Sequence, residues 1–373
     1  MKKVLIIYKY LPQYRIDFFQ QLKTRLKIHN IELYLIHGKS NKINSLKKDE
    51  ETIGWATIIK NIELKAGAKS LIWQPCLKNL KDKDLIITLP ENKLLLNYYL
   101  MIGRNFSNYK FAYWGHVYNM QNDLNNIRNK GKLLFIKKCD WWFAYTEGAR
   151  NFLINSKFAA NKITVVQNAI STFDIRKSYS EIKEYQIKNI KEKLDINSSN
   201  IAIYCGAMYP EKDFDFILET CYRIKKEIPD FHMLFVGSGI ESSKIENAAA
   251  KTEWIHYIGS KFGEDRIIYF KISLLQLMPR AVGLAIVDSF AMETPIVTTE
   301  YPYHGPEIDY LENGVNGLIT KNDINIYSDA VIQLLQNQSY LQLIDGCNIS
   351  AEKYTVENMV ENFKNGILDC LSC

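Results

Sequence analysis

Short apolar runs alternate with amphipathic segments along the chain. In the first half, the runs KVLIIY (3–8), IELYLIHG (31–38) and DLIITL (84–89) have the length and composition of buried strands, whereas YRIDFFQQLKTRL (14–26) has a helical period. More strand-like runs follow at YKFAYWG (109–115), DWWFAYT (140–146) and KITVVQN (162–168). Strands that alternate with helices predict a parallel sheet with helices on both faces.

A second series of strand-like runs begins after a polar segment at 174–200. These runs are IAIYCG (201–206), HMLFVGSG (232–239), IHYIG (255–259), LLQLM (274–278) and PIVTT (295–299). The pattern of residues 179–196 predicts one helix that leads into this second series. A chain of 373 residues is long for a single core. We therefore expect an α/β protein of two doubly wound, Rossmann-like domains, 1–172 and 173–355, and a C-terminal helix, 356–373, that packs back on the first domain. Ligands of such folds bind outside the carboxyl ends of the strands.

Composition narrows the class of protein. The hydrophobic fraction is 47% and the charged fraction 24%, both typical of a soluble globular protein. No apolar run reaches the roughly 18–20 residues that a membrane span needs. The seven cysteines are scattered, mostly in apolar segments, which favours a reducing cytoplasm over a disulfide framework. Two DxD strings, 82–84 and 213–215, lie in a lysine-rich loop and at a helix start, so we expect neither to bind a metal.

Charge is divided unevenly along the chain. Residues 1–170 contain 28 Lys and Arg against 12 Asp and Glu, a balance of +16, and residues 171–373 contain 19 against 29, a balance of −10. A basic half predicts an anionic partner, such as a membrane surface, a phosphorylated acceptor or a nucleic acid. The alternative is scattered solubility charge. The segment KGKLLFIKKCDWW (130–142) is either an interfacial membrane segment or an ordinary amphipathic helix.

Glycine-rich turns follow several strands of the second series. YCGAMYPEKDFDFILE (204–219) reads as a strand, a Gly turn and a helix capped by Asp213, and such a turn presents backbone N–H groups to an anion. Lys212 is either a phosphate ligand at this turn or a surface lysine beside the cap. FVGSGIE (235–241) ends another strand with two glycines, which allow a ligand to approach the backbone closely.

Two later segments add carboxylates to these turns. In PRAVGLAIVDSFAMETP (279–295), Gly283 is expected at a helix start and Asp288 about one and a half turns further on. Asp288 is either a satisfied structural carboxylate or the acceptor for a ribose diol. HGPEIDYLENGVNG (304–317) carries Glu307 before another Gly-rich loop.

The order of these motifs resembles a known family. The pattern GxxxPEKxxD, VGxG, IxxIG, VGLxxxDxFAxxxP and PE…L…GxNG is similar to the C-terminal half of GT-B, family 4-like retaining glycosyltransferases of the bacterial surface-polysaccharide type. Weaker similarity extends through PQYRIDFFQQL, YWGHVYN and YTEGARNFL in the first half.

The resemblance implies roles for individual residues. It implies nucleotide-sugar-binding roles for Gly206, Lys212, Gly237, Arg280, Gly283, Leu284, Asp288 and Glu307. It implies catalytic roles for His116, near the donor sugar, and Lys212, at the diphosphate. The expected acceptor-binding residues are Tyr14, Arg15 and Tyr118.

The chain departs from the family pattern at two positions. Arg280 stands where the family has the first Glu of a pair, which contacts donor-sugar hydroxyls, and Ala207 stands where a Gly-Arg turn has its Arg. We hypothesise that Arg280 restores the missing positive charge. These departures also keep a non-catalytic nucleotide-sugar binding protein open as an alternative.

The resemblance implies an enzyme that moves a sugar from a nucleoside diphosphate sugar to a glycan or polyprenyl-pyrophosphate-linked acceptor, with retention, in the synthesis of O-antigen, lipopolysaccharide, capsule or another surface polysaccharide. It implies no metal or other cofactor. We expect a cytoplasmic protein, with peripheral contact to anionic membrane as one possibility. A nucleotide-sugar epimerase of the same fold is an alternative. A nucleic-acid binder is another, although the sequence has no standard basic-aromatic module.

Overall fold

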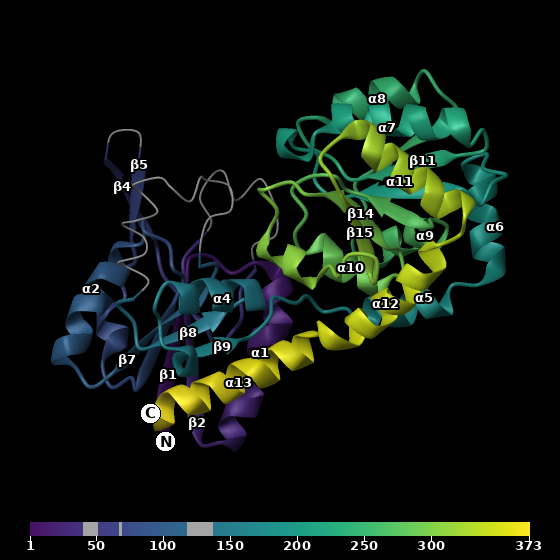
Figure 1. Cartoon of the computed structure of the whole chain (residues 1–373). Helices are drawn as coiled ribbons and strands as arrows, with labels where there is room; N and C mark the ends of the chain where they lie inside the picture. The colour runs from purple at the N-terminus through teal and green to yellow at the C-terminus, as the bar shows by residue number, and fades with distance from the viewer. Residues whose placement is uncertain (40–50, 67–68, 118–136) are drawn as a thin grey trace. The chain divides into compact units, whose positions relative to one another are not determined.

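The computed structural model describes residues 1–39, 51–66, 69–117 and 137–373 (Figure 1). The chain divides into two compact units. The first consists of Met1–Ile170 and Val356–Cys373, and the second of Ser171–Thr355. The last segment of the chain therefore belongs to the same unit as the first.

A parallel sheet of seven strands forms the centre of the first unit, in the order β3-β2-β1-β6-β7-β8-β9. Its strands are β1 Lys2–Tyr8, β2 Ile31–His37, β3 Thr57–Ile58, β6 Leu85–Thr88, β7 Lys110–Gly115, β8 Trp141–Ala144 and β9 Ile163–Val165. Two further strands, which sequence patterns did not indicate, pair as an antiparallel hairpin, β4 Ile62–Ala66 and β5 Lys69–Trp73.

Helices cover both faces of this sheet. They are α1 Ile16–Ile28, α2 Leu95–Gly103, α4 Glu147–Asn155 and α13 Val356–Ser372, with short 3-10 turns η1 Gln13–Arg15, η3 Leu77–Leu80, η4 Arg104–Phe106 and η5 Ala160–Lys162. Successive residues of β1 point to opposite faces, as the period of a strand requires. Val4 and Ile6 join the core formed with α1 and α13, whereas Leu5 and Ile7 join the core formed with α2 and α4.

The second unit contains a parallel sheet of six strands, in the order β12-β11-β10-β13-β14-β15. Its strands are β10 Ile201–Cys205, β11 His232–Val236, β12 Ile255–Gly259, β13 Leu275–Leu277, β14 Ile296–Thr299 and β15 Gly317–Thr320. The order runs outward from β10 in both directions, so the direction of winding changes between β10 and β13. A ligand site is expected at such a switch point, at the carboxyl ends of the strands.

The helices of the second unit are α5 Phe173–Glu181, α6 Glu184–Lys193, α7 Phe214–Glu227, α8 Ser242–Ala249, α9 Ile267–Lys271, α10 Ala285–Ala291, α11 Ile324–Gln336 and α12 Tyr340–Lys353, with 3-10 turns η6 Pro210–Lys212, η7 Gly263–Arg266 and η8 Pro306–Tyr310. The prediction of one helix over 179–196 was wrong. The chain breaks between α5 and α6, where Lys183 is extended and its N–H donates to Oε1 of Gln186 at 2.8 Å. This local side-chain bond starts a new helix without the Gly or Pro that would have marked the break.

None of the helices in the described ranges is long and apolar enough to cross a membrane. All seven cysteines are free thiols, of which six are buried and Cys373 is exposed. The segment 130–142 lies mostly outside the described residues. Its described part, 137–142, consists of a turn and bends up to Asp140 and the first two residues of β8.

Candidate functional site

The turns after β10 and β13 carry most of the residues singled out in the second half of the sequence. These strands are neighbours in the sheet and lie on either side of the switch point. Gly206 and Lys212 follow β10, and Arg280, Gly283 and Leu284 follow β13. The fold therefore gathers these residues at one edge of the sheet.

Lys212 connects the two turns. It ends η6, and its Nζ donates a hydrogen bond to the carbonyl oxygen of Ala281. Burial lowers the pKa of the Lys212 ammonium to about 8, because the charged form loses hydration in this position. Lys212 is therefore not a freely solvated surface lysine. It is an ammonium held against the turn after β13, and it would gain from the arrival of an anion.

An ion pair makes a second connection between the same turns. Asp213 begins α7, and its Oδ1 accepts the N–H of Phe216 at 3.1 Å, which confirms the predicted cap. Its Oδ2 lies 2.7 Å from Nη1 of Arg280. The guanidinium of Arg280 also lies 5.4 Å from the ring centroid of Tyr301. Arg280 therefore replaces an expected carboxylate with a cation that Asp213 already neutralises.

The turn after β13 presents backbone donors. Ala281 has a φ of +50°, which bends the chain sharply before α10. The N–H of Val282 is bonded to Nδ1 of His304 at 3.0 Å. The described parts of the chain contain no acceptor for the N–H groups of Gly283 and Leu284. Two neighbouring N–H groups beside an ammonium form an arrangement that can bind a phosphate oxygen.

His304 fixes the shape of this turn, and sequence reasoning gave it no role of its own. The imidazole is 4% exposed, and its Nε2 lies 2.9 Å from the carbonyl oxygen of Thr299. Because Nδ1 accepts the N–H of Val282, Nε2 carries the proton and donates to Thr299. Burial lowers the pKa of His304, so the neutral tautomer is favoured. In the HGPE segment, Glu307 was singled out from the sequence. The histidine of the same segment was the feature that could have indicated this structural role.

Glu307 and Gly305 pack against the same turn. The N–H of Gly305 donates to the carbonyl oxygen of Val282 at 2.6 Å. A Cβ at Gly305 would lie 2.7 Å from Oε2 of Glu307 and 3.1 Å from Cα of Gly283, so a larger residue here would displace the carboxylate or the turn. Glu307 is 4% exposed. Its carboxylate lies near Gly283 and Gly305, and its role in binding the nucleotide sugar stays a prediction.

Gly237 brings the turn after β11 close to the turn after β10. Its φ is +139°, and a Cβ there would lie 1.9 Å from the carbonyl oxygen of Gly206. Only glycine can occupy this position. The two backbones can therefore approach each other closely beside the turn that carries Lys212.

Asp288 has a partner that the sequence did not reveal. It lies in α10, and its two carboxylate oxygens accept hydrogen bonds of 2.6 and 2.7 Å from Nη2 and Nη1 of Arg266. Their side chains are 13% and 17% exposed. Burial disfavours the charge of Arg266, but the Asp288 carboxylate outweighs this and raises the pKa of the guanidinium. A carboxylate held by one bidentate pair still has lone pairs for two hydroxyl groups.

His116 lies in the first unit, directly after Gly115 at the carboxyl end of β7. Its side chain is exposed, and its ring meets Tyr145 edge to face with centroids 5.0 Å apart. It therefore stands at the edge of the sheet where parallel α/β folds bind ligands.

The structure places Arg15 differently from the expectation of an acceptor-binding residue. Its side chain is 0% exposed, bonded to the Asn168 side chain and to the carbonyl oxygen of Ala169, and its guanidinium carbon lies 5.2 Å from the Trp114 ring centroid. A guanidinium fits this cage because its flat apolar faces can stack on rings while its edges donate hydrogen bonds. Arg15 therefore connects buried segments inside the first unit. Tyr14 is 37% exposed, and Tyr118 lies outside the described residues.

The chain is similar to known glycosyltransferases in sequence and in fold. The family model described as "Glycosyl transferases group 1" matches residues 199–337. An uncharacterized glycosyltransferase of Haemophilus influenzae is 27% identical over 293 residues, which cover 76% of each chain. A glycosyltransferase structure from Rickettsia africae has a TM-score of 0.68 at 17% identity, covering 99% of this chain and 98% of that one. Anabaena Alr3699/HepE, solved with UDP, has a TM-score of 0.69 at 12% identity, covering 99% of this chain and 100% of that one.

These matches identify the class of enzyme. Residues 199–337 form a group 1 glycosyltransferase domain, which lies within the second unit and contains Lys212, His304 and Asp288. The two Rossmann-like units have the GT-B fold. The chain is a glycosyltransferase.

Proposed function

We propose that this enzyme transfers a sugar from a nucleoside diphosphate sugar, with retention, to a hydroxyl group on a glycan or polyprenyl-pyrophosphate-linked acceptor, in the synthesis of a bacterial surface polysaccharide such as O-antigen. The second unit binds the nucleotide, and the first unit binds the acceptor. The enzyme works in the cytoplasm, at the inner face of the membrane that holds such an acceptor.

One observation carries the donor part of this proposal. The ammonium of Lys212 is hydrogen-bonded to the turn after β13. Two residues of the same turn, Gly283 and Leu284, have backbone N–H groups without an acceptor in the described ranges. A diphosphate supplies the negative oxygens that such a group of donors lacks. Asp288 would accept the ribose hydroxyls of the same nucleotide, and Arg266 would hold its carboxylate in place.

The same donors supply the catalysis. As the glycosidic bond breaks, negative charge grows on the β-phosphate of the leaving nucleotide. Donors that are already in place for that charge stabilise the transition state more than the ground state. Lys212 and the N–H groups of Gly283 and Leu284 fill this role without a metal ion. His116 acts on the donor sugar from the end of β7.

The donor can be identified by a screen. Purified enzyme is incubated with a panel of nucleotide sugars, beginning with UDP-glucose because the Anabaena protein was solved with UDP-glucose. We expect slow hydrolysis of one donor without acceptor and an unchanged anomeric configuration in the transferred product. A Lys212→Ala variant should lose this hydrolysis, whereas a matched exposed lysine of the same unit, Lys188→Ala, should retain it.

Two outcomes would overturn the proposal. Formation of a free epimer of the donor sugar without acceptor would identify an epimerase. Tight nucleotide-sugar binding without turnover of any donor would identify a non-catalytic binding protein. This outcome is tested because the chain departs from the family pattern at Arg280 and Ala207.

A further inference from the structure

The outer face of α2 and η4 in the first unit is apolar and exposed. Tyr98, Tyr99, Ile102 and Phe106 are 39%, 48%, 59% and 85% exposed. They are spaced three or four residues apart along the chain, apart from the adjacent tyrosines, so they follow one side of the helix and its extension. The opposite side carries Leu96 and Leu100, which are buried against the sheet. Contiguous exposed apolar side chains of this kind mark interaction surfaces.

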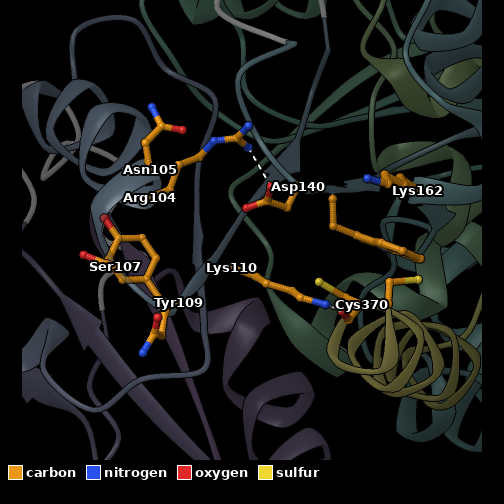
Figure 2. A pocket seen from close by; sticks show the side chains of 11 residues that line it. Arg104, Asn105, Ser107, Tyr109, Lys110, Asp140, Lys162 and Cys370 are labelled. Carbon is orange, nitrogen blue, oxygen red and sulfur yellow. Dashed lines mark hydrogen bonds and ion pairs between the residues drawn. The ribbon is translucent and has the colours of Figure 1, made fainter.

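A basic cavity lies next to this apolar stripe. It has a volume of about 290 Å³ and borders η4 and the amino ends of β7 and β8, at the edge of the sheet opposite to His116. Figure 2 shows the side chains that line it. Asn105 and Ser107, on either side of Phe106 in the chain, line it. The stripe and the cavity therefore meet at η4.

The charged side chains that line the cavity are three cations and one carboxylate, a net side-chain charge of +2. Arg104 Nη1 lies 2.8 Å from Asp140 Oδ1 (Figure 2). Lys110 Nζ donates to the carbonyl oxygen of Cys370 at 2.6 Å. Lys162 also lines the cavity, and its Nζ has no ion-pair or hydrogen-bond partner in the described part of the chain. Burial raises the pKa of Cys370 to about 12, so its thiol adds no negative charge. An anionic group would compensate these cations.

The net charge of the whole first unit also favours an anionic partner. Residues 1–170 have a balance of +16, and residues 356–373 contain one Lys against three Asp and Glu, so the first unit has a net formal charge of +14. Aromatic and aliphatic side chains beside a cationic cavity on a strongly basic unit match an anionic lipid surface, where rings and alkyl chains enter the interface and cations meet phosphates.

We propose that α2 and η4 form the membrane contact of this enzyme. Phe106 and Ile102 insert into the interface, and the cavity of Arg104, Lys110 and Lys162 binds the phosphate of an anionic phospholipid. This assignment differs from an interfacial membrane segment at 130–142, which the sequence left open beside an ordinary amphipathic helix and of which 130–136 lie outside the described residues. It does not depend on the nucleotide site, which lies in the other unit.

Sedimentation with vesicles tests the proposal. The full-length protein is mixed with vesicles of phosphatidylcholine alone or of phosphatidylcholine and phosphatidylglycerol in equal parts, at low and high salt. We expect binding to the anionic vesicles at low salt, partial release at high salt and no binding to the neutral vesicles. The double variant Ile102→Ser/Phe106→Ser should bind about tenfold more weakly or worse, because the inserted apolar area is lost.

A matched control separates insertion from a general loss of surface hydrophobicity. Phe173 and Ile349 belong to the second unit and are each 72% exposed, so Phe173→Ser/Ile349→Ser should bind vesicles like the wild type. Lys162→Glu should weaken binding to anionic vesicles and reduce its salt dependence. UDP affinity should be unchanged in all three variants. Vesicle binding therefore tests the membrane contact separately from the proposed donor site.

Three results would overturn the proposal. One is wild-type protein that ignores anionic vesicles at low salt. Another is equal vesicle binding by the wild type and by Ile102→Ser/Phe106→Ser. The third is a concentration-dependent dimer that this double variant abolishes while vesicle binding persists, which would assign the stripe to a second copy of the chain.

Discussion

Nζ of Lys212 donates a hydrogen bond to the carbonyl oxygen of Ala281, and the next pair of residues outward, Asp213 and Arg280, forms an ion pair of 2.7 Å. Two contacts thus join the turn after β10 to the turn after β13. Their effect is to fix the ammonium beside the N–H groups of Gly283 and Leu284 before any ligand arrives. Donors that are fixed in advance do not need to reorganise when charge develops.

The pair of Asp288 and Arg266 yields a prediction about stability as well as binding. Asp288→Ala leaves the largely buried Arg266 without its carboxylate, so we expect a loss of roughly 2–4 kcal/mol in the free energy of unfolding. UDP affinity should also fall in this variant, measured under conditions where it remains folded. Chemical denaturation and calorimetric titration provide the two measurements.

A double variant separates the two effects. Arg266→Met/Asp288→Leu removes both charges and should recover much of the lost stability, because no ion remains unpaired. It should not recover UDP affinity if Asp288 accepts the ribose hydroxyls. Recovery of both would reduce Asp288 to a structural partner of Arg266.

The pattern of apolar runs indicated the main strands of both sheets because each run is buried on two faces and is hence continuously apolar. KVLIIY and IAIYCG are the clearest examples, and they became β1 and β10. The hairpin of β4 and β5 was missed because its strands lie outside the sheet, with Ile62 and Leu64 nearly half exposed. β15 was missed because GLIT has only four residues within a Gly-rich loop.

His304 allows a test of how the turn after β13 is shaped. His304→Phe removes the acceptor for the N–H of Val282 and the donor to Thr299, so UDP affinity should fall about tenfold and stability by about 1–3 kcal/mol. His304→Gln offers an amide oxygen and an amide N–H in their place and should rescue most of the affinity. Equal UDP affinity in the wild type and in His304→Phe would show that the turn does not need this residue.

His116 should act on the reaction more than on binding. We expect His116→Ala to lower kcat at least tenfold, about 1.4 kcal/mol of transition-state stabilisation, and to change the donor KM much less. The fold should be unaffected, since the side chain is exposed. Steady-state kinetics with the identified donor and acceptor, beside a thermal melt, gives the comparison. A kcat near that of the wild type would show that His116 is not a catalytic residue.

Side chains of the site were harder to foresee than strands because their partners are distant in the sequence. Asp288 stood out as a lone carboxylate in an apolar run, but nothing local indicated Arg266, which is 22 residues earlier. Arg15 was expected to bind the acceptor, whereas two of the rings that surround it, Trp114 and Tyr145, come from segments about 100 residues or more later in the sequence. The Gly-rich turns were easier to recognise because close backbone approach requires glycine itself.

The affinity of the enzyme for UDP as a function of pH tests the role of Lys212 most directly. The free ammonium has a pKa of about 8, so it is charged below that pH and loses its charge above it. A bound diphosphate favours the charged form, so wild-type affinity should fall as pH rises through 8 and beyond, and binding there should take up a proton. Lys212→Arg keeps its charge over this range and should bind UDP with little dependence on pH, whereas Lys212→Ala should bind weakly throughout. Calorimetric titrations that give the wild type and Lys212→Ala the same affinity and the same pH profile would contradict the assignment of this turn to the diphosphate.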